Sequence, residues 1–394
     1  MKFLIAGACA VLLVILYFVC FVKPRDGGSA ATPAKGSERR AEPVDPTAWT
    51  TYHGNFALDG VAATSVPDAP ERLWRFKAGN RVETTPVSQG GRIYFTSAKG
   101  GLFAVDLAGN ELWKTSIAPD SFTSPPLLVD GILIIGSGKG QLRAYEAAAG
   151  KEKWSYEVGG NVQGTPNRIE LPGGMKGVMA ISPSDGSIHG IDLETGKGVW
   201  KTPGAERCDG SAGVGGGLIV MGSCASALHL YSVAKAEKQG DVPLGGDNQV
   251  AGGVALSGSL AFAGTRSGKF CSVDVAAGKI VWMNTDNQGE SFMTPAVGSS
   301  VVVFGSDDGK IYGLNRATGA KLWAFDTGNR PSSPVIAGDR AIVSSGGNLF
   351  LVDLKTGAKV WSAAVGDEIT SPAVVGGRVI VGSDDGTVSA YGQK

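Results

Sequence analysis

Tryptophan recurs along this chain with a period of about forty residues, and this feature constrains the fold more than any other. Seven of the eight tryptophans obey the period, with spacings of 39, 41, 46, 82, 41 and 38 residues: Trp74, Trp113, Trp154, Trp200, Trp282, Trp323 and Trp361. The spacing of 82 is two steps of 41 with one tryptophan missing. A fixed period of this length is typical of architectures built from one repeated supersecondary unit.

One repeat, residues 293–323, shows what the unit is. Three turn signals, at 298–300, 307–309 and 317–319, divide it into four short apolar runs. The second signal is Asp307-Asp308-Gly309, and Asp-Gly favours the positive φ that tight hairpins need. A second Asp-Asp-Gly stands at 384–386. Four antiparallel strands in forty residues form one blade of a β-propeller.

Counting the repeats gives eight blades. Seven units are complete, one of them ending near Gly240 without a tryptophan, and the eighth stops at Tyr391 before its last strand. The segment around Trp74 supplies the missing strand from the other end of the chain. The predicted fold class is therefore all-β, an eight-bladed β-propeller of four-stranded antiparallel blades whose ring is closed by the N-terminal strand, because closure hides sheet edges.

Proline marks the innermost strand of the repeat. Six units carry it near the start of that strand: Pro86, Pro125, Pro166, Pro295, Pro334 and Pro372. Proline cannot donate to a sheet ladder and belongs on an edge strand. The strand that lines a propeller's central channel is such an edge, so local chemistry and architecture agree.

The N-terminus has a different composition. Residues Phe3 to Val22 are uncharged and mostly apolar, which is the length of about 20 residues that a membrane-spanning helix needs. The run ends without a small-residue cleavage site, so we expect one uncleaved transmembrane helix, with a cleaved signal or a lipoprotein at Cys9 as alternatives. The predicted domains are a membrane anchor or signal segment at 1–25, a disordered linker at 26–48, a lead-in segment packed on the propeller at 49–71, and the propeller at 72–394.

The sequence gives two conflicting indications of the anchor's orientation. More Lys and Arg residues follow the apolar run than precede it, and a positive-inside count places the propeller in the cytoplasm. Cys208 and Cys224 flank the first hairpin of blade four, where we expect them to be neighbours and predict a disulfide that needs an oxidising compartment. We therefore expect the periplasmic face of a bacterial cell envelope, with the chain anchored in the inner membrane.

The residues around each periodic tryptophan resemble a known family. The pattern Ala-x-Asp-x-x-Thr-Gly-x-x-x-Trp is similar to the tryptophan-docking motif of PQQ-like (quinoprotein-type) eight-bladed propellers. It appears in three close copies, which end at Trp200, Trp323 and Trp361; blade four has lost it, with Ser232 and Gly240 in its places. The resemblance covers about residues 72–393 and implies that each tryptophan packs between neighbouring blades.

This family implies two kinds of function. One branch consists of dehydrogenases that hold PQQ and calcium on the propeller axis, with a pair of adjacent cysteines, which this chain lacks. The other consists of non-enzymatic envelope scaffolds like the outer-membrane protein assembly factor BamB. The sequence favours a BamB-like scaffold or protein-binding module, with a role in outer-membrane protein assembly as what the resemblance implies. The alternatives are a PQQ-dependent dehydrogenase and a ligand-sensing ectodomain.

No residue pattern predicts chemistry. The two Asp-Asp-Gly sequences are interpreted as hairpin turns, His53, His189 and His229 have no metal-ligand spacing, and Lys plus Arg equals Asp plus Glu, 36 each. We expect no catalytic, cofactor or metal site and no nucleic-acid partner. The expected partners are other envelope proteins and, through the N-terminal helix, the membrane, with the propeller itself monomeric.

Overall fold

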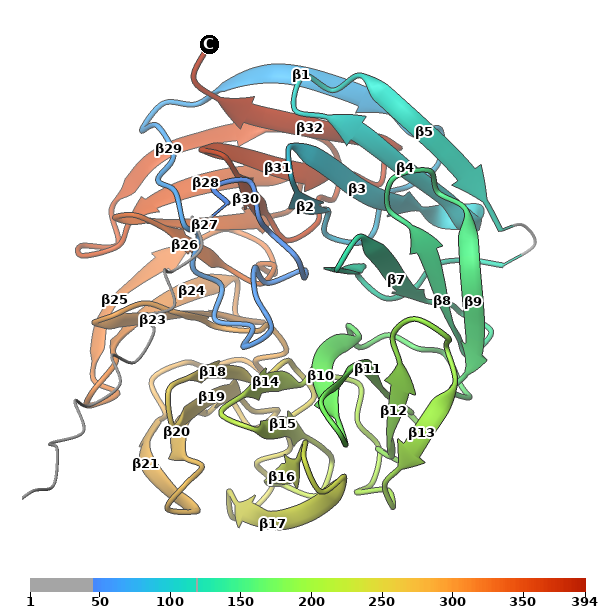
Figure 1. Ribbon diagram of the computed structural model, residues 1–394. Coiled ribbons are helices and arrows are strands. Elements are labelled where there is room, and N and C mark those ends of the chain that lie inside the picture. Colours follow the sequence, from blue (N-terminus) through green and yellow to red (C-terminus); the bar gives the residue numbers. More distant parts are fainter. Residues whose placement is uncertain (1–44, 118–119) are drawn as a thin grey trace, which may run out of the picture. The chain divides into compact units, whose positions relative to one another are not determined.

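The computed structural model describes residues 45–117 and 120–394, which form a ring of eight sheets around a central channel (Figure 1). The predicted anchor and most of the predicted linker lie outside the described residues. Within the part of the chain that is described, no helix is both long and apolar enough to cross a membrane.

The first four blades each consist of consecutive strands in the order inner to outer. Blade one contains β2 (Val87–Gln89), β3 (Arg92–Ser97), β4 (Gly101–Asp106) and β5 (Glu111–Ser116), with a single 3-10 turn at Ala98–Gly100. Blade two contains β6 (Leu127–Val129), β7 (Ile132–Gly136), β8 (Gln141–Glu146) and β9 (Glu152–Glu157). Blade three contains β10 (Asn167–Leu171), β11 (Met175–Ile181), β12 (Ile188–Asp192) and β13 (Gly198–Lys201). Blade four contains β14 (Gly213–Gly215), β15 (Leu218–Gly222), β16 (Ala227–Ser232) and β17 (Glu237–Pro243).

The next three blades repeat this order, and the eighth joins the two ends of the ring. Blade five contains β18 (Ala255–Ser257), β19 (Leu260–Gly264), β20 (Phe270–Asp274) and β21 (Lys279–Asn284). Blade six contains β22 (Ala296–Val297), β23 (Val301–Ser306), β24 (Lys310–Asn315) and β25 (Lys321–Asp326). Blade seven contains β26 (Val335–Ala337), β27 (Arg340–Ser345), β28 (Asn348–Asp353) and β29 (Lys359–Ala364). Blade eight contains β30 (Ala373–Val375), β31 (Arg378–Gly382), β32 (Thr387–Gly392) and, outermost, β1 (Glu71–Lys77).

Blade eight confirms the predicted closure of the ring. Strand β1 pairs antiparallel with β32, and Trp74 lies opposite Ala390. The N-terminal strand therefore completes the sheet that the C-terminal end leaves short. The eight-bladed count, the four-stranded blades and the closing strand are all as the tryptophan period predicts.

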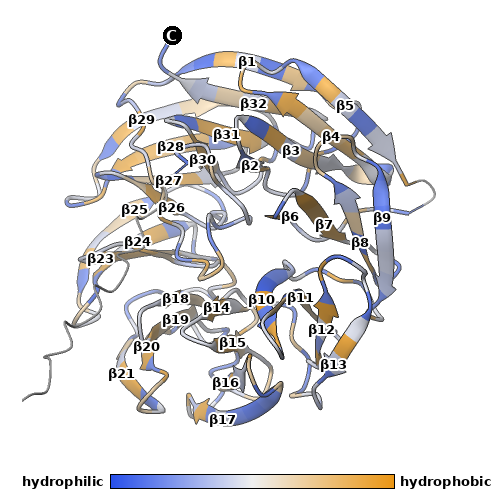
Figure 2. Ribbon diagram, viewed as in Figure 1, coloured by the Kyte–Doolittle hydropathy of each residue, from blue (hydrophilic) through white to orange (hydrophobic). Residues whose placement is uncertain are grey.

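The core lies between neighbouring blades. Phe270 of blade five stacks on Phe304 of blade six with ring centroids 4.2 Å apart. Figure 2 shows apolar colour on the second and third strands and long hydrophilic stretches on the outer strands β9 and β17. This pattern follows from burial on both faces of a blade's middle strands, as in β23, where every residue is buried.

The outer strand of each complete blade contains a bulge beside its tryptophan position. In blade six, Gly313 lies opposite Trp323, and the register shifts before Leu314 pairs with Lys321. The extra residue, Leu322, points outward and is 48% exposed. The bulge therefore turns the tryptophan toward the next blade while its neighbour stays in solvent.

Antiparallel order gives the ring two different faces. We call one of them the plugged face. It carries the turns between first and second strands and between third and fourth strands, such as 90–91 and 107–110. The open face carries the turns between second and third strands and the loops between blades, such as 137–140 and 158–166.

Candidate functional site

The lead-in segment, residues 45–66, closes the channel on the plugged face (Figure 1). Trp49 exchanges two backbone hydrogen bonds with Ser88 of blade one, and the Gly60 carbonyl accepts from Ile336 N–H of blade seven at 2.8 Å. Between these points the segment meets the inner strands of blades one to seven in ring order, and on either side of them it meets the turn Gly376–Gly377 of blade eight. The other contacts are Pro46 O with Gly376 N, Thr50 O with Leu128 N, Phe56 O with Asn167 Nδ2 and with Val214 N, Ala57 O with Leu256 N, Asp59 O with Val297 N, and Thr64 Oγ1 with Gly377 N.

These contacts satisfy a backbone N–H donor on six of the eight inner strands, those of blades one, two, four, five, six and seven. An inner strand has no sheet partner on its channel side, so its backbone N–H groups need other acceptors. The segment's contacts start at Asp45, before the predicted boundary at Trp49, because the Asp45 carboxylate accepts from Gly90 N–H at 2.9 Å. The segment also adds apolar side chains to the cores between blades, among them Trp49, which is 1% exposed.

Tyr52 extends from the lead-in segment to the inner edges of blades five and six. Its hydroxyl is hydrogen-bonded to the Thr294 hydroxyl of blade six, and a Cβ on Gly253 of blade five would lie 2.7 Å from it. Burial raises the pKa of Tyr52 to about 12, so the phenol stays protonated. A ring of hydroxyl side chains ties the blades together at this depth, as where Ser333 Oγ accepts from Thr294 N–H at 3.0 Å.

His53 fixes the segment beside Tyr52. Its Nδ1 lies 2.7 Å from the Leu58 carbonyl, and its Nε2 lies 2.9 Å from the Pro334 carbonyl of blade seven. Complete burial lowers the pKa of His53, although both carbonyls favour the charged form. A neutral imidazole carries one N–H and donates to one of the two carbonyls. His53 is therefore a structural residue of the plug.

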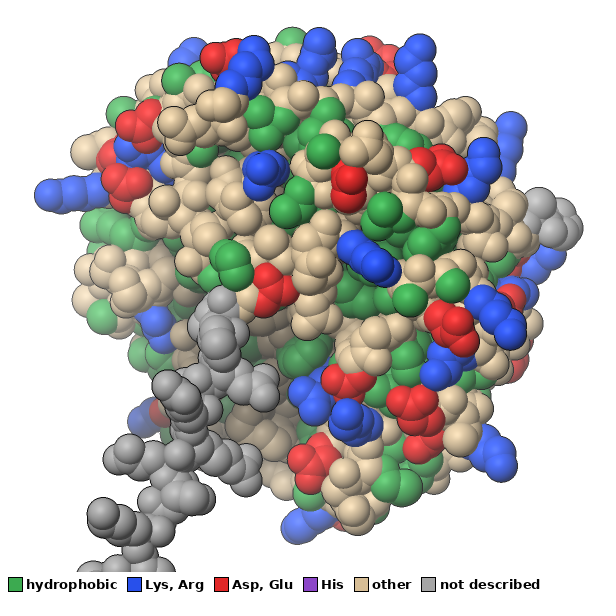
Figure 3. Space-filling view, turned by 45° about the horizontal axis from the view of Figure 1, so that its top comes forward, with side chains coloured by type: hydrophobic (Ala, Val, Ile, Leu, Met, Phe, Trp, Pro, Cys, Tyr) green, Lys and Arg blue, Asp and Glu red, His purple; other side chains and the backbone are tan. Residues whose placement is uncertain are grey.

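Small cavities lie among the loops of the open face. One cavity of about 160 Å³ lies between blades eight and one and includes Arg81, Glu83 and Glu368. Another of about 350 Å³ lies over blades three and four and includes Asn161 and Arg207. Elsewhere on the molecule, over the part of the surface that Figure 3 shows, acidic and basic side chains are interspersed.

One cluster has the geometry of a hydrolase triad, although sequence analysis missed it. His229 Nε2 lies 2.7 Å from Ser223 Oγ, and its Nδ1 lies 2.6 Å from Asp241 Oδ1. Ser223 is 1% exposed and His229 is 2% exposed, so no substrate reaches the hydroxyl. The three residues instead connect the last three strands of blade four.

Both Asp-Asp-Gly sequences lie in the turn between the second and third strands of their blades, as interpreted from the sequence. Asp308 Oδ1 accepts from Lys310 N–H at 3.1 Å, and Asp385 forms an ion pair with Arg75 of β1. Within residues 45–117 and 120–394, no group of three or more His, Cys, Asp or Glu side chains could hold a metal ion.

The two cysteines of blade four are neighbours in free-thiol form. Cys224 N–H donates to the carbonyl of Arg207, the residue before Cys208, at 3.2 Å. Cys208, Cys224 and Cys271 are all free, and the Cys208 thiol donates to the Gly210 carbonyl at 3.8 Å. Burial raises the pKa of Cys208 to about 12, which keeps it a thiol. The disulfide stays a prediction.

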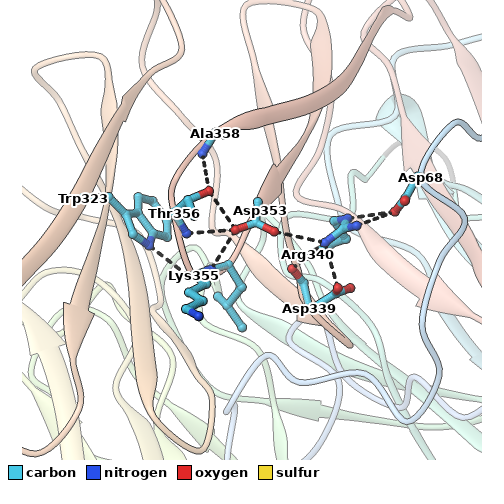
Figure 4. Close-up of polar contacts among 9 residues, drawn as sticks. Asp68, Trp323, Asp339, Arg340, Asp353, Lys355, Thr356 and Ala358 are labelled. Carbon is cyan, nitrogen blue, oxygen red and sulfur yellow. Dashed lines mark hydrogen bonds and ion pairs between the residues drawn. The ribbon is translucent and has the colours of Figure 1, made fainter.

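Five periodic tryptophans contact the next blade in the same way. Figure 4 shows one: the Trp323 indole N–H donates to the Leu354 carbonyl of blade seven at 2.9 Å, beside a turn held by Asp353 and Thr356. The same bond, at 2.9–3.1 Å, links Trp74 to Leu107, Trp113 to Ala147, Trp154 to Leu193, and Trp282 to Arg316.

Two of the tryptophans differ from this arrangement. The buried Trp200 N–H has no partner among the described residues. In blade four, which it faces, Ala236, at φ 55°, takes the place of the turn glycine. Trp361 faces blade eight, which has no turn between third and fourth strands, and its ring lies 5.8 Å from that of Tyr391.

The chain is similar to known proteins in sequence and in structure. The profile of the family described as outer membrane protein assembly factor BamB matches residues 104–249 and 184–393. A protein of that name from Burkholderia pseudomallei is 26% identical over 291 residues, which is 69% of this chain and 74% of that protein. A quinohemoprotein alcohol dehydrogenase from Comamonas testosteroni is 26% identical over 205 residues, 44% of this chain and 29% of that enzyme.

Solved structures show the same fold. BamB from Moraxella catarrhalis superposes with a TM-score of 0.70 at 19% identity, covering 83% of this chain and 98% of that one. A europium-containing methanol dehydrogenase superposes with a TM-score of 0.75 at 12% identity, covering 89% and 98%. The fold is thus shared with enzymes, and the sequence profile decides the family. The chain belongs to the family of outer membrane protein assembly factor BamB, on the PQQ-like eight-bladed propeller fold.

Proposed function

We propose that this chain is a non-enzymatic scaffold of the bacterial cell envelope that holds other proteins during outer-membrane protein assembly. The observation that carries the proposal is the plug. Tyr52 reaches the inner edges of blades five and six, and the lead-in segment is hydrogen-bonded to all eight blades. This leaves the loops of the open face as the surface on which partners bind.

The proposal also rests on the relatives. The curated relatives that match most of this chain carry the name of the assembly factor BamB, including a Xanthomonas campestris protein 25% identical over 335 residues. We propose the assembly role for this chain because its relatives carry that name. The envelope partners expected from the sequence follow from the same resemblance.

The proposed location is the periplasmic face of the inner membrane, with residues 1–25 as the anchor. The support is the uncharged run from Phe3 to Val22. A reporter enzyme that is active only outside the cytoplasm, fused after Lys394, tests the orientation. An active reporter supports export, whereas an inactive but intact fusion contradicts it in favour of the positive-inside count.

The experiment for the function is affinity purification of the full chain from gently solubilised membranes, with the co-purified proteins identified. We expect components of outer-membrane protein assembly. The same preparation is then mixed with PQQ, calcium and a dye acceptor. Recovery of electron carriers alone, together with alcohol-dependent dye reduction, contradicts the scaffold and establishes the quinoprotein alternative.

A further inference from the structure

Arginine has the same place in two neighbouring blades, at the start of the second strand. Arg340 of β27 pairs with Ala337, and Arg378 of β31 pairs with Val375, each across a turn of two residues. Both arginines therefore lie on the plugged face. Their surroundings differ in the supply of carboxylates, so the first arginine shows what the second lacks.

Three carboxylates surround Arg340 (Figure 4). Asp68 Oδ1 accepts from the Nε of Arg340 at 2.9 Å and from its Nη2 at 2.6 Å. Asp339 and Asp353 form ion pairs with its Nη1 at 2.9 and 3.4 Å. The guanidinium of Arg340 thus has an acidic partner at each of its three nitrogens.

Arg378 lacks the counterparts of these carboxylates. In its turn, Gly377 stands in the place of Asp339. Across the sheet, Gly392 stands in the place of Asp353, and a Cβ on this glycine would lie 3.2 Å from the Cγ of Arg378. The Nε of Arg378 is buried and has no acceptor among the described residues. A guanidinium N–H that is withdrawn from water without an acceptor is unfavourable, so this place favours an acceptor from elsewhere.

A cavity of about 340 Å³ lies beside Arg378. Three parts of the chain line it, namely the lead-in segment with Pro67, the turn 376–377 and the C-terminal residue Gln393. Arg378 is the one charged side chain among the described residues that line it. The hydroxyl of Ser65 and the amide of Gln393 are further groups that can donate hydrogen bonds. The cavity therefore combines a cation and other donors with no acidic side chain.

We propose that this cavity binds the carboxylate of a small organic acid, which takes the place at Arg378 that Asp68 has at Arg340. A guanidinium holds a carboxylate through charge-assisted hydrogen bonds, and Arg340 shows Nε and Nη2 doing so on this fold. Because three separate parts of the chain bound a cavity of this volume, its occupant is a small molecule. This inference stands apart from the scaffold role, since the cavity is on the plugged face.

The first test is a titration of the full chain in detergent, with isotope-labelled arginine so that NMR detects each Nε–H. The probes are acetate, glutarate, and acetamide, which has the shape of acetate without its charge. Ionic strength is constant, and the buffer contains no other carboxylate and no phosphate. We expect saturable shifts at Arg378 with both acids and about tenfold weaker binding of acetamide, because a hydrogen bond between charged groups is lost. Absence of saturable shifts at Arg378 with either acid overturns the proposal.

Two variants complete the titration. Arg378→Lys keeps the charge but removes the Nε–H and the planar fork, so we expect about tenfold weaker binding of glutarate. Arg92→Lys is the matched control, because Arg92 has the same place in blade one, opposite Gln89, and is exposed; it should bind glutarate as wild type does. Glutarate should raise the melting temperature of wild type and of Arg92→Lys but not that of Arg378→Lys. Unchanged binding in folded Arg378→Lys contradicts the proposal.

The class of ligand is tested by competition against bound glutarate. The competitors are inorganic phosphate and a glutamate residue capped as its N-acetyl methylamide, which presents the carboxylate as a protein would. We expect neither to displace glutarate at equal concentration. Displacement by phosphate would show a general anion site, and displacement by capped glutamate would assign the cavity to an acidic side chain of a protein. Either result overturns the assignment to a small organic acid.

Discussion

Trp49 and Ser88 exchange two backbone hydrogen bonds, of 2.7 and 2.8 Å, and so join the lead-in segment to the first inner strand of the ring. The same segment meets blade eight at both of its ends, through Pro46 and Thr64. It thereby spans the blade in which the two ends of the chain close the ring. The stability of the closed ring should therefore depend on a segment outside all eight sheets.

Removal of the lead-in contacts should destabilise the ring. Trp49→Ala deletes a fully buried indole from the core between blades eight and one, and we expect a loss of about 3–5 kcal/mol in the free energy of unfolding. Chemical denaturation of the folded propeller measures it. Leu112→Ala, at a residue 45% exposed, is the control and should stay within about 0.5 kcal/mol of wild type. Equal effects of the two substitutions contradict a structural role for the segment.

Tyr52 provides a test of the filled channel. Tyr52→Phe keeps the ring and removes the bond to Thr294, and we expect a loss of about 1 kcal/mol. The phenol, whose pKa burial raises to about 12, should not ionise on titration to pH 11. Ultraviolet difference spectra of wild type and Tyr52→Phe check this. A tyrosinate signal near pH 10 that disappears in the variant would show a wet, open axis.

Replacing a periodic tryptophan by phenylalanine should cost more stability where its indole N–H is hydrogen-bonded to the next blade. Trp323→Phe loses the bond to Leu354 as well as ring area, whereas Trp200→Phe loses only ring area, because the Trp200 N–H has no partner. We expect Trp323→Phe to lower the free energy of unfolding by about 1 kcal/mol more than Trp200→Phe. Denaturation curves of the pair measure the difference, and a larger loss for Trp200→Phe is the contrary result.

The Ser223, His229 and Asp241 cluster should give an acid dependence of stability. Partial burial acts to raise the pKa of Asp241, but hydrogen bonds from Lys238 and His229 outweigh it and hold the pKa below its usual value. A lowered folded-state pKa gives stability that is present above the unfolded-state pKa, about 4, and is lost as pH falls through the folded value. Stability of wild type should therefore fall more steeply than that of Asp241→Asn below about pH 4. If the stability of wild type and of Asp241→Asn falls equally with pH, Asp241 does not cause the acid dependence.

The predicted disulfide can be tested directly. Non-reducing peptide mapping of the chain purified from an oxidising compartment should find Cys208 bonded to Cys224, with Cys271 free. The bond would stabilise blade four by roughly 3 kcal/mol for a loop of this size. Reduction should then lower the melting temperature of wild type and leave Cys208→Ala unchanged. Free thiols at all three positions in that material rule the bond out.

The sequence predicts the blades well because the tryptophan signal is local. A tryptophan on seven of the eight outer strands, a turn glycine and an Asp-Gly hairpin each have a residue signature, so the repeat and its closure by Trp74 follow. The differing environments of Trp200 and Trp361 do not follow, because they depend on the neighbouring blade. Ala236 in place of glycine and the missing turn of blade eight decide them.

The plug is harder to predict for a physical reason. Thr50, Phe56 and Gly60 hold the inner strands through backbone carbonyls, and a carbonyl carries no residue-type signal. The Ser223, His229 and Asp241 cluster is hidden in another way, since three separate strands bring the side chains together only once the blade register is known.

The central claim is that partners bind the open face because the other face is plugged. Site-specific photo-crosslinking in cells compares Asn161 and Glu368 on the open face with Lys176 and Asp339 on the plugged face, all of them exposed. We predict that crosslinks to outer-membrane assembly components form from Asn161 or Glu368 and are absent from Lys176 and Asp339. Crosslinks to those components from the plugged-face positions alone would contradict the account.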